Sequence, residues 1–185
     1  GSSVLANAQP LLNEYKIGPL TVAHNGNLTN APQLRRELVA QGALFQTTTD
    51  TEVLLHLIAR SRKDSPEDQI REALEQCEGA FTLLLSVGRV IYAVVDSRGF
   101  RPLVMGRIGG GVVVASETCA LDLVGAQMVC ELLPGQFLRI EDGHITELPR
   151  LKPRPVSRCV FELVYFARPD SRVFGESVDR VRREL

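Results

Sequence analysis

Residues 81–95 read Phe-Thr-Leu-Leu-Leu-Ser-Val-Gly-Arg-Val-Ile-Tyr-Ala-Val-Val, and they give the clearest indication of the fold class. Two apolar runs, 81–87 and 90–95, are separated by Gly88-Arg89, which places glycine at the first central position of a two-residue turn. This pattern is typical of a β-hairpin. We therefore predict antiparallel strands in the middle of the chain.

Short apolar runs continue on the carboxyl-terminal side of this hairpin. Asp142-Gly143, which separates the last two runs, is a strong type I′ turn signal because both residues tolerate positive φ. A short helix is expected over 117–124. The further expected strands are 103–105, 111–115, 128–132, 136–140 and 144–148.

On the amino-terminal side, apolar residues recur at helical spacing. Ser65 is a plausible N-cap with Pro66 in the first helical position. Thr49 and Glu52 fit a capping box at the start of another helix. The predicted helices are 31–41, 51–61 and 66–78, packed together on one face of a sheet.

One short strand is expected before these helices, at 20–23, followed by the turn-rich segment 24–27. Segregated helices and antiparallel strands indicate an α+β layered domain and argue against a doubly wound βαβ sheet. The chain of 185 residues is long enough for one domain with a proper core.

Composition excludes several classes of protein. Apolar residues make up 44% of the chain and charged residues 23%, which excludes a disordered or fibrous protein. No apolar stretch approaches the roughly 18 residues of a membrane span. The net charge is −1, with a basic cluster only at 180–183, so neither nucleic acid nor a membrane is expected as a partner.

The four cysteines are widely spaced and form no C-x-x-C pair. Without a signal peptide, free thiols in a cytoplasmic protein are the better interpretation.

Residues 149–155 contain three prolines among basic residues, which predicts a linker. We therefore divide the chain at residue 150, with an apolar run at 159–166 and a charged helix-like tail from Ser177 beyond it.

The octet at 21–28 reads Thr-Val-Ala-His-Asn-Gly-Asn-Leu and resembles the oxyanion loop of class II glutamine amidotransferases, which are N-terminal nucleophile hydrolases. Asn25 offers a side-chain amide, and Gly26 lets a backbone N–H approach a ligand closely. Two such donors can stabilise a tetrahedral oxyanion. An ordinary Asn-Gly turn is the alternative, and His24 is interpreted as a structural residue.

Asp50, within Thr-Thr-Asp-Thr-Glu at 48–52, resembles the family residue that binds the α-amino group of glutamine. The alternative interpretation is that Asp50 is only a residue of the first turn of a helix, where the helix macrodipole stabilises its carboxylate. The resemblance thus implies Asn25 and Gly26 as catalytic residues, and Asp50 with Gly26 as residues that bind substrate.

Four further segments resemble the amidophosphoribosyltransferase family, whose members carry a glutaminase domain followed by a phosphoribosyltransferase domain. The resemblance implies a four-layer αββα sandwich of the N-terminal nucleophile type, incomplete at its amino terminus. It implies a glutaminase domain at 1–150, with a linker and the start of a phosphoribosyltransferase domain at 151–185. The four segments that carry this resemblance are 96–103, 115–121, 162–171 and 177–183.

In this family, glutamine is hydrolysed and the ammonia goes to phosphoribosyl pyrophosphate. The family's nucleophile is an amino-terminal cysteine, but this sequence begins with Gly1, so we expect an inactive fragment. Mg²⁺ would belong to the missing phosphoribosyltransferase domain. Cys159 coincides with one thiolate ligand of a [4Fe–4S] cluster in the iron–sulfur type of the family. A homo-oligomer is also expected.

Two other interpretations stay open at this point. A sugar-phosphate or aspartate amidotransferase of the same class would keep the fold and change the ammonia acceptor. A non-enzymatic descendant would keep the sandwich as a binding module, which leaves Asn25, Gly26 and Asp50 without an obvious purpose.

Overall fold

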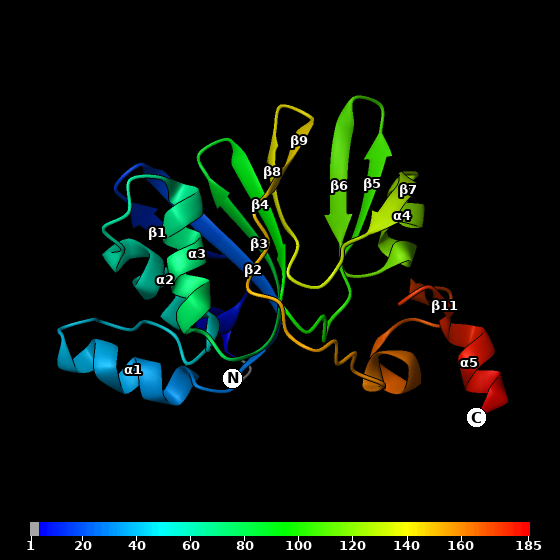
Figure 1. The fold of residues 1–185 in the computed structure, drawn as a ribbon, viewed down its shortest axis with the longest axis horizontal. Coiled ribbons are helices and arrows are strands. Elements are labelled where there is room, and N and C mark those ends of the chain that lie inside the picture. The colour runs from blue at the N-terminus through cyan, green and yellow to red at the C-terminus, as the bar shows by residue number, and fades with distance from the viewer. Residues whose placement is uncertain (1–3) are drawn as a thin grey trace.

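The computed structural model describes residues 4–185, and it confirms the α+β class (Figure 1). Three helices lie on one face of a six-stranded sheet, and a three-stranded sheet packs on its other face. One more helix covers the outer face of the small sheet. The order of layers is therefore helix, sheet, sheet, helix, the predicted αββα sandwich.

The six-stranded sheet has the order β1-β2-β3-β4-β8-β9, and every neighbouring pair is antiparallel. The hairpin predicted over residues 81–95 is β3–β4, with Val87 opposite Val90 across the Gly88-Arg89 turn. The Asp142-Gly143 turn between β8 and β9 has positive φ at both residues, as type I′ requires. The strands are β1 Leu11–Tyr15, β2 Gly18–Leu28, β3 Gly79–Val87, β4 Val90–Val95, β8 Phe137–Glu141 and β9 His144–Leu148.

The first three helices bury their apolar stripes against this sheet, as predicted. Leu54 and Ile58 of one helix and Ile70 of the next meet strand residues in a single core. Ser65 caps the third helix, since its Oγ accepts a hydrogen bond from Asp68 N at 3.1 Å. The helices are α1 Ala31–Ala40, α2 Thr51–Arg60 and α3 Pro66–Gln76.

The smaller sheet has the order β6-β5-β7. Met105 and Leu132 meet Ala93, Val95 and Leu138 in a second core between the two sheets. A third core, formed by Val104, Leu121 and Ala126, joins the small sheet to α4. These elements are β5 Val104–Ile108, β6 Gly111–Ala115, α4 Thr118–Val124 and β7 Gln127–Glu131.

The carboxyl-terminal segment follows residues 149–159, which have no regular secondary structure. Ala167, Val173 and Val178 form a small core of their own. The predicted domain boundary at residue 150 stays a prediction. The elements are a single π-helical turn η2 Glu162–Phe166, β10 Arg172–Val173, β11 Glu176–Ser177 and α5 Val178–Glu184; a 3₁₀ turn η1 Leu5–Asn7 lies near the other end.

Two expectations for the first thirty residues are wrong. β1 was not expected, because its residues show little alternation of apolar and polar side chains. The strand expected at 20–23 does not end in a turn at 24–27: β2 continues to Leu28 and pairs with β3 along nine residues. Long-range pairing here overrides the local turn preference of Asn and Gly.

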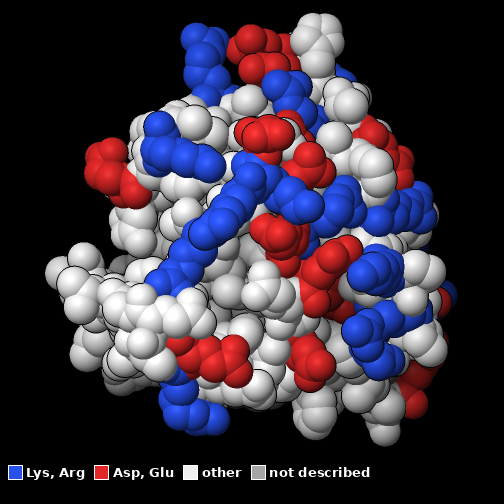
Figure 2. All heavy atoms as spheres, turned by 60° about the vertical axis from the view of Figure 1, so that its left-hand side comes forward, with Lys and Arg blue, Asp and Glu red and all other residues white. Residues whose placement is uncertain are grey.

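The helical side of the molecule carries charges of both signs. A row of Lys and Arg crosses this face, with Asp and Glu on both sides of it (Figure 2). Within residues 4–185, none of the helices has the length and apolar character needed to cross a membrane.

The outer helix provides a test of the layered architecture. Leu121 is fully buried between α4 and the small sheet, whereas Leu123 on the same helix is 78% exposed. We expect Leu121→Ala to lower the free energy of unfolding by about 2–5 kcal/mol. Leu123→Ala is the matched control and should change it by less than about 0.5 kcal/mol. Equal denaturation midpoints for the two variants would contradict the fourth layer.

Candidate functional site

Asn25 and Gly26 lie in the last third of β2, opposite Thr82 and Phe81 of β3. A Cβ atom on Gly26 would lie 2.0 Å from the carbonyl oxygen of Ala80, so only glycine fits at this position. The side-chain amide of Asn25 donates a long hydrogen bond of 3.4 Å to Ser116 Oγ. Both residues are therefore held by paired backbone and not by a free turn.

His24 connects this strand to the start of α2. Its side chain is 2% exposed, and Nδ1 lies 3.0 Å from Thr51 Oγ1 and 3.9 Å from Asp50 Oδ1. Burial lowers the pKa of His24 below its usual value of 6.5, against the opposing effects of Asp50 and the Ala80 carbonyl, and Arg101 lowers it further. His24 thus occupies a buried position between the two candidate elements.

Asp50 precedes the first residue of α2, at the N-cap position, but it does not cap its own helix. Instead its Oδ2 accepts a hydrogen bond of 2.7 Å from the backbone N–H of Leu28, at the end of β2. The structure therefore brings Asp50 to the same strand end as Asn25 and Gly26. The predicted roles of these three residues stay predictions.

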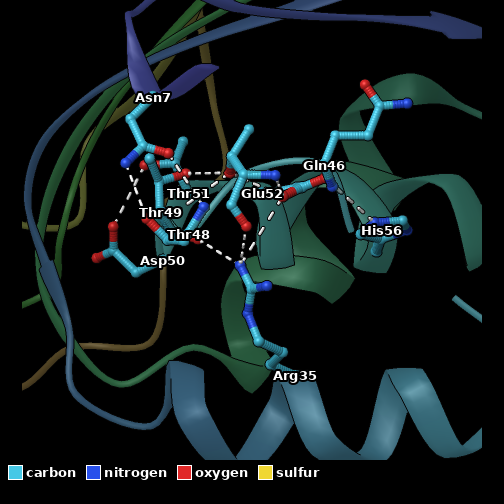
Figure 3. Close-up of polar contacts among 10 residues, drawn as sticks. Asn7, Arg35, Gln46, Thr48, Thr49, Asp50, Thr51, Glu52 and His56 are labelled. Carbon is cyan, nitrogen blue, oxygen red and sulfur yellow. Dashed lines mark hydrogen bonds and ion pairs between the residues drawn. The ribbon is translucent and has the colours of Figure 1, made fainter. Parts of the chain in front are cut away.

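The predicted capping box of Thr49 and Glu52 is wrong. The Glu52 side chain is 4% exposed and turns back to the preceding loop, where it accepts hydrogen bonds from Gln46 N at 2.7 Å and Thr47 N at 2.8 Å (Figure 3). Thr47 Oγ1 donates a third bond to it at 2.7 Å. The buried carboxylate satisfies loop N–H groups that would otherwise lack partners.

Two more side chains fix the same loop from other elements. Arg35 of α1 donates from Nη2 to the carbonyls of Thr47 and Thr49, each at 3.0 Å. Asn7 of η1 exchanges two hydrogen bonds with Thr48, one to its Oγ1 and one from its N–H (Figure 3). Asp50 is therefore presented by a loop that three elements anchor.

The cysteines of the described residues offer no alternative nucleophile beside this site. Burial, with a smaller effect of Asp50, raises the pKa of Cys77 to about 12, so Cys77 stays a thiol at neutral pH. Cys159 is half-buried, and its backbone N–H donates to the Phe100 carbonyl at 3.2 Å. Within residues 4–185, no three His, Cys, Asp or Glu side chains gather as a metal site. The residues present therefore do not by themselves fit a four-thiolate cluster.

A cavity of about 430 Å³ opens between the end of α3, the start of β3 and the segment around Lys152. Its lining includes Thr29, Gly79 and Arg98 but none of the three candidate site residues. This cavity is therefore separate from the three candidate site residues.

Comparison with known proteins gives the family. A family model described as a glutamine amidotransferase domain matches residues 3–123. The chain belongs to this glutamine amidotransferase domain family. The match covers the Asn25-Gly26 strand, Asp50 and Ser116 in a single stretch.

The similarity of this amidotransferase domain to amidophosphoribosyltransferases extends over its whole length. It is 44% identical to the Rhizobium etli amidophosphoribosyltransferase over 100% of this chain, and 42% identical to the one from Bacillus subtilis. The Bacillus subtilis glutamine phosphoribosylpyrophosphate amidotransferase structure, complexed with ADP and GMP, superposes with a TM-score of 0.91 at 43% identity over 96% of this chain. A class-II domain protein from Silicibacter pomeroyi, with a TM-score of 0.55 at 18% identity, shares the fold alone.

The chain spans less than two fifths of the length of these two curated relatives, 38% of the first and 39% of the second. The comparisons therefore establish the family of this amidotransferase domain, and they do not extend to the activity of a whole enzyme.

Sequence reasoning missed the anchoring roles of Glu52, Arg35 and Ser116. One signal was available for Glu52: it is a carboxylate beside the apolar run 53–55, where an acidic residue must find partners if it is buried. Arg35 binds a loop 12 to 14 positions away and Ser116 contacts a strand residue 91 positions away, and no local pattern marks either role.

The close approach at Gly26 predicts a steric effect on stability. In Gly26→Ala the new methyl group would collide with the Ala80 carbonyl, so we expect a much lower midpoint of thermal unfolding. Gly18→Ala is the control, because Gly18 also has positive φ but has nothing within 4 Å of the added carbon. A Gly26→Ala variant as stable as Gly18→Ala would contradict the observed β2–β3 register.

The buried imidazole predicts a pH dependence of stability. Because the pKa of His24 is lower in the folded protein than in the unfolded chain, the unfolded chain binds more protons below about pH 6.5. The free energy of unfolding should therefore fall as the pH is lowered through that region. NMR titration of the His24 ring should give a pKa below 6.5, and a value above 6.5 would show that Asp50 outweighs burial.

Proposed function

We propose that this chain is the glutamine-hydrolysing part of an amidophosphoribosyltransferase, the enzyme of the first committed step of purine synthesis. In this proposal, glutamine gives glutamate and ammonia, and the ammonia passes to phosphoribosyl pyrophosphate to give phosphoribosylamine. The observation that carries it is the 44% identity to an amidophosphoribosyltransferase along the entire chain, residues 151–185 included.

Asn25 and Gly26 are the proposed oxyanion donors. When a nucleophile attacks the carboxamide carbon of glutamine, the carbonyl oxygen becomes negative, and the Asn25 Nδ2 and Gly26 N–H groups stabilise it. Such donors act in the transition state and not on the bound substrate, so they raise kcat. The support is structural: strand pairing holds both residues, and Ser116 contacts the Asn25 amide.

Asp50 is the proposed partner of the glutamine α-amino group. Its Oδ2 is engaged with Leu28 N, and Oδ1 faces His24 and Thr51 at longer distances of 3.9 and 3.4 Å. A carboxylate in this state retains acceptor capacity for an ammonium group. The anchored loop of residues 46–49 keeps this carboxylate in place.

The remaining parts of the enzyme belong to the proposal alone. The nucleophile is an amino-terminal cysteine thiolate whose own α-amino group acts as base. Mg²⁺ serves the phosphoribosyltransferase domain, and Cys159 supplies one of four thiolates if the full-length protein holds a [4Fe–4S] cluster. A cytoplasmic homo-oligomer completes the proposal, and the unpaired state of the four cysteines supports that compartment.

A chimera tests the assignment of the oxyanion donor. This chain would replace the matching segment of the Bacillus subtilis relative, and the remaining length of that relative would provide the proposed nucleophile and second domain. We expect glutamine-dependent glutamate release, and Asn25→Ala should lower kcat by about 100-fold with little change in KM. Asn13→Ala on β1 is the control. A chimera without glutaminase activity would refute the proposed function, and an Asn25→Ala kcat within twofold would refute the donor role.

The same chimera separates binding from catalysis at Asp50. Asp50→Asn removes the charge that would pair with the α-amino group, so KM for glutamine should rise by about tenfold, more than kcat falls. The measurement is a full kinetic curve for glutamine. An unchanged KM would leave Asp50 as a structural anchor for the end of β2.

A further inference from the structure

The tripeptide Ser116-Glu117-Thr118, which runs from the end of β6 to the first residue of α4, contacts two parts of the molecule that are far apart in sequence. Ser116 contacts Asn25, while Glu117 and Thr118 bind the carboxyl-terminal segment. The segments at 115–121 and 162–171 therefore meet in space. Neither the fold nor the proposed glutamine chemistry explains why these two segments are in contact.

The contact on the side of the glutamine site crosses between the two sheets. Asn25 belongs to β2 of the six-stranded sheet, and Ser116 follows β6 of the three-stranded sheet. The hydrogen bond from Asn25 Nδ2 to Ser116 Oγ, at 3.4 Å, is long. A modest shift of Ser116 would therefore either strengthen or break it.

The contacts on the other side are shorter and partly buried. Glu117 Oε2 accepts hydrogen bonds from Arg168 N and from Ser171 Oγ, each at 2.8 Å, and Thr118 Oγ1 accepts one from Arg172 N at 2.9 Å. Ser171 is 1% exposed. The loop at 168–172 is thus bound by the two residues that directly follow Ser116.

Glu117 does not serve its own helix. It occupies the N-cap position of α4, yet its side chain makes no capping hydrogen bond there. Its carboxylate is directed to the 168–172 loop and to the thiol of Cys119, 3.7 Å away. An acidic residue at a helix start would normally be explained by capping, and that explanation does not apply here.

The carboxyl-terminal segment has a second attachment that does not involve Ser116. Arg101 Nη1 donates to Glu162 Oε1 at 2.5 Å, and the guanidinium of Arg101 lies 4.4 Å from the centre of the Phe166 ring. Because these contacts hold η2 independently of Glu117, a change at Glu117 can loosen the 168–172 loop without detaching the whole segment.

We propose that Ser116 is a positioning residue for the Asn25 side chain, and that Glu117 and Thr118 make its position depend on the docked 168–172 loop. The glutamine site is then at full activity when the carboxyl-terminal segment is docked. This inference rests on the proposed role of Asn25 as an oxyanion donor. The inference adds that the position of the Asn25 side chain depends on whether the 168–172 loop is docked.

A double-mutant cycle in the chimera tests the first half of the proposal. Ser116→Ala should lower kcat for glutamine hydrolysis by about fivefold with KM nearly unchanged, the effect of one hydrogen bond. In the Asn25→Ala background the same substitution should have no further effect. Ser116→Thr, which keeps a hydroxyl, should restore most of the activity. A fivefold loss that persists without Asn25 would overturn the positioning role.

Two controls distinguish positioning from a loss of stability. Ser65→Ala removes the N-cap hydroxyl of α3, so it should lower the unfolding midpoint and leave kcat unchanged. Ser116→Ala should show the opposite pattern, with kcat lowered and the midpoint nearly unchanged. If both variants lose activity in proportion to their stability, Ser116 is structural only.

NMR of the 185-residue chain tests the second half without any enzymatic reaction. Glu117→Gln should shift the side-chain amide resonances of Asn25, because loss of the charge that binds Arg168 N and Ser171 Oγ loosens the 168–172 loop and moves Ser116. Glu147→Gln is the control, since Glu147 is an exposed residue paired with Arg150. Asn25 resonances that are unchanged in Glu117→Gln would overturn the coupling, whether or not the proposed function holds.

Discussion

The pairing of β2 with β3 is the constraint on which the rest of this structure depends. Nine residues of each strand are in register, from Leu20 opposite Val87 to Leu28 opposite Gly79. One face of this pair carries the buried side chains of the main core, and its far end carries Asn25 and Gly26. The pairing is possible only because Gly26 has no Cβ to collide with Ala80. The absence of a Cβ at Gly26 is therefore required both for the pairing of the sheet and for the geometry of the candidate site.

The segments around this strand end are held by carboxylates, of which Glu52 and Asp96 are buried and Glu117 is half-buried. Glu52 accepts from the 46–47 backbone, Asp96 accepts from Phe81 N and Phe100 N, and Glu117 accepts from Arg168 N. A charged acceptor makes stronger hydrogen bonds than a neutral one, and burial makes an unpaired charge expensive. Each loop therefore has a single favourable arrangement, which is what precise placement of catalytic groups requires.

The predictable part of the fold is the part that local patterns encode. The β3–β4 hairpin, the type I′ turn and the α3 cap each depend on neighbouring residues, and all were read correctly from the sequence. β1 pairs with residues of β2 that are 3 to 11 positions away, Glu52 binds residues 5 and 6 positions away, and the extension of β2 pairs with β3 more than fifty positions away. Asn25, Gly26 and Asp50 were singled out by family resemblance. Their convergence on one strand end could not be derived from spacing alone.

The anchoring pattern bears on the choice of Asp50 as the substrate-binding carboxylate. Both oxygens of Glu52 and both oxygens of Asp96 accept hydrogen bonds of 2.7–3.1 Å, so these two carboxylates offer little to a ligand. Asp50 makes one short bond, to Leu28 N, and its second oxygen has contacts no shorter than 3.4 Å. Among these three carboxylates, Asp50 is therefore the one with capacity for an ammonium group. Its position beside the strand end of Asn25 and Gly26 places that capacity where the α-amino group of glutamine is proposed to bind.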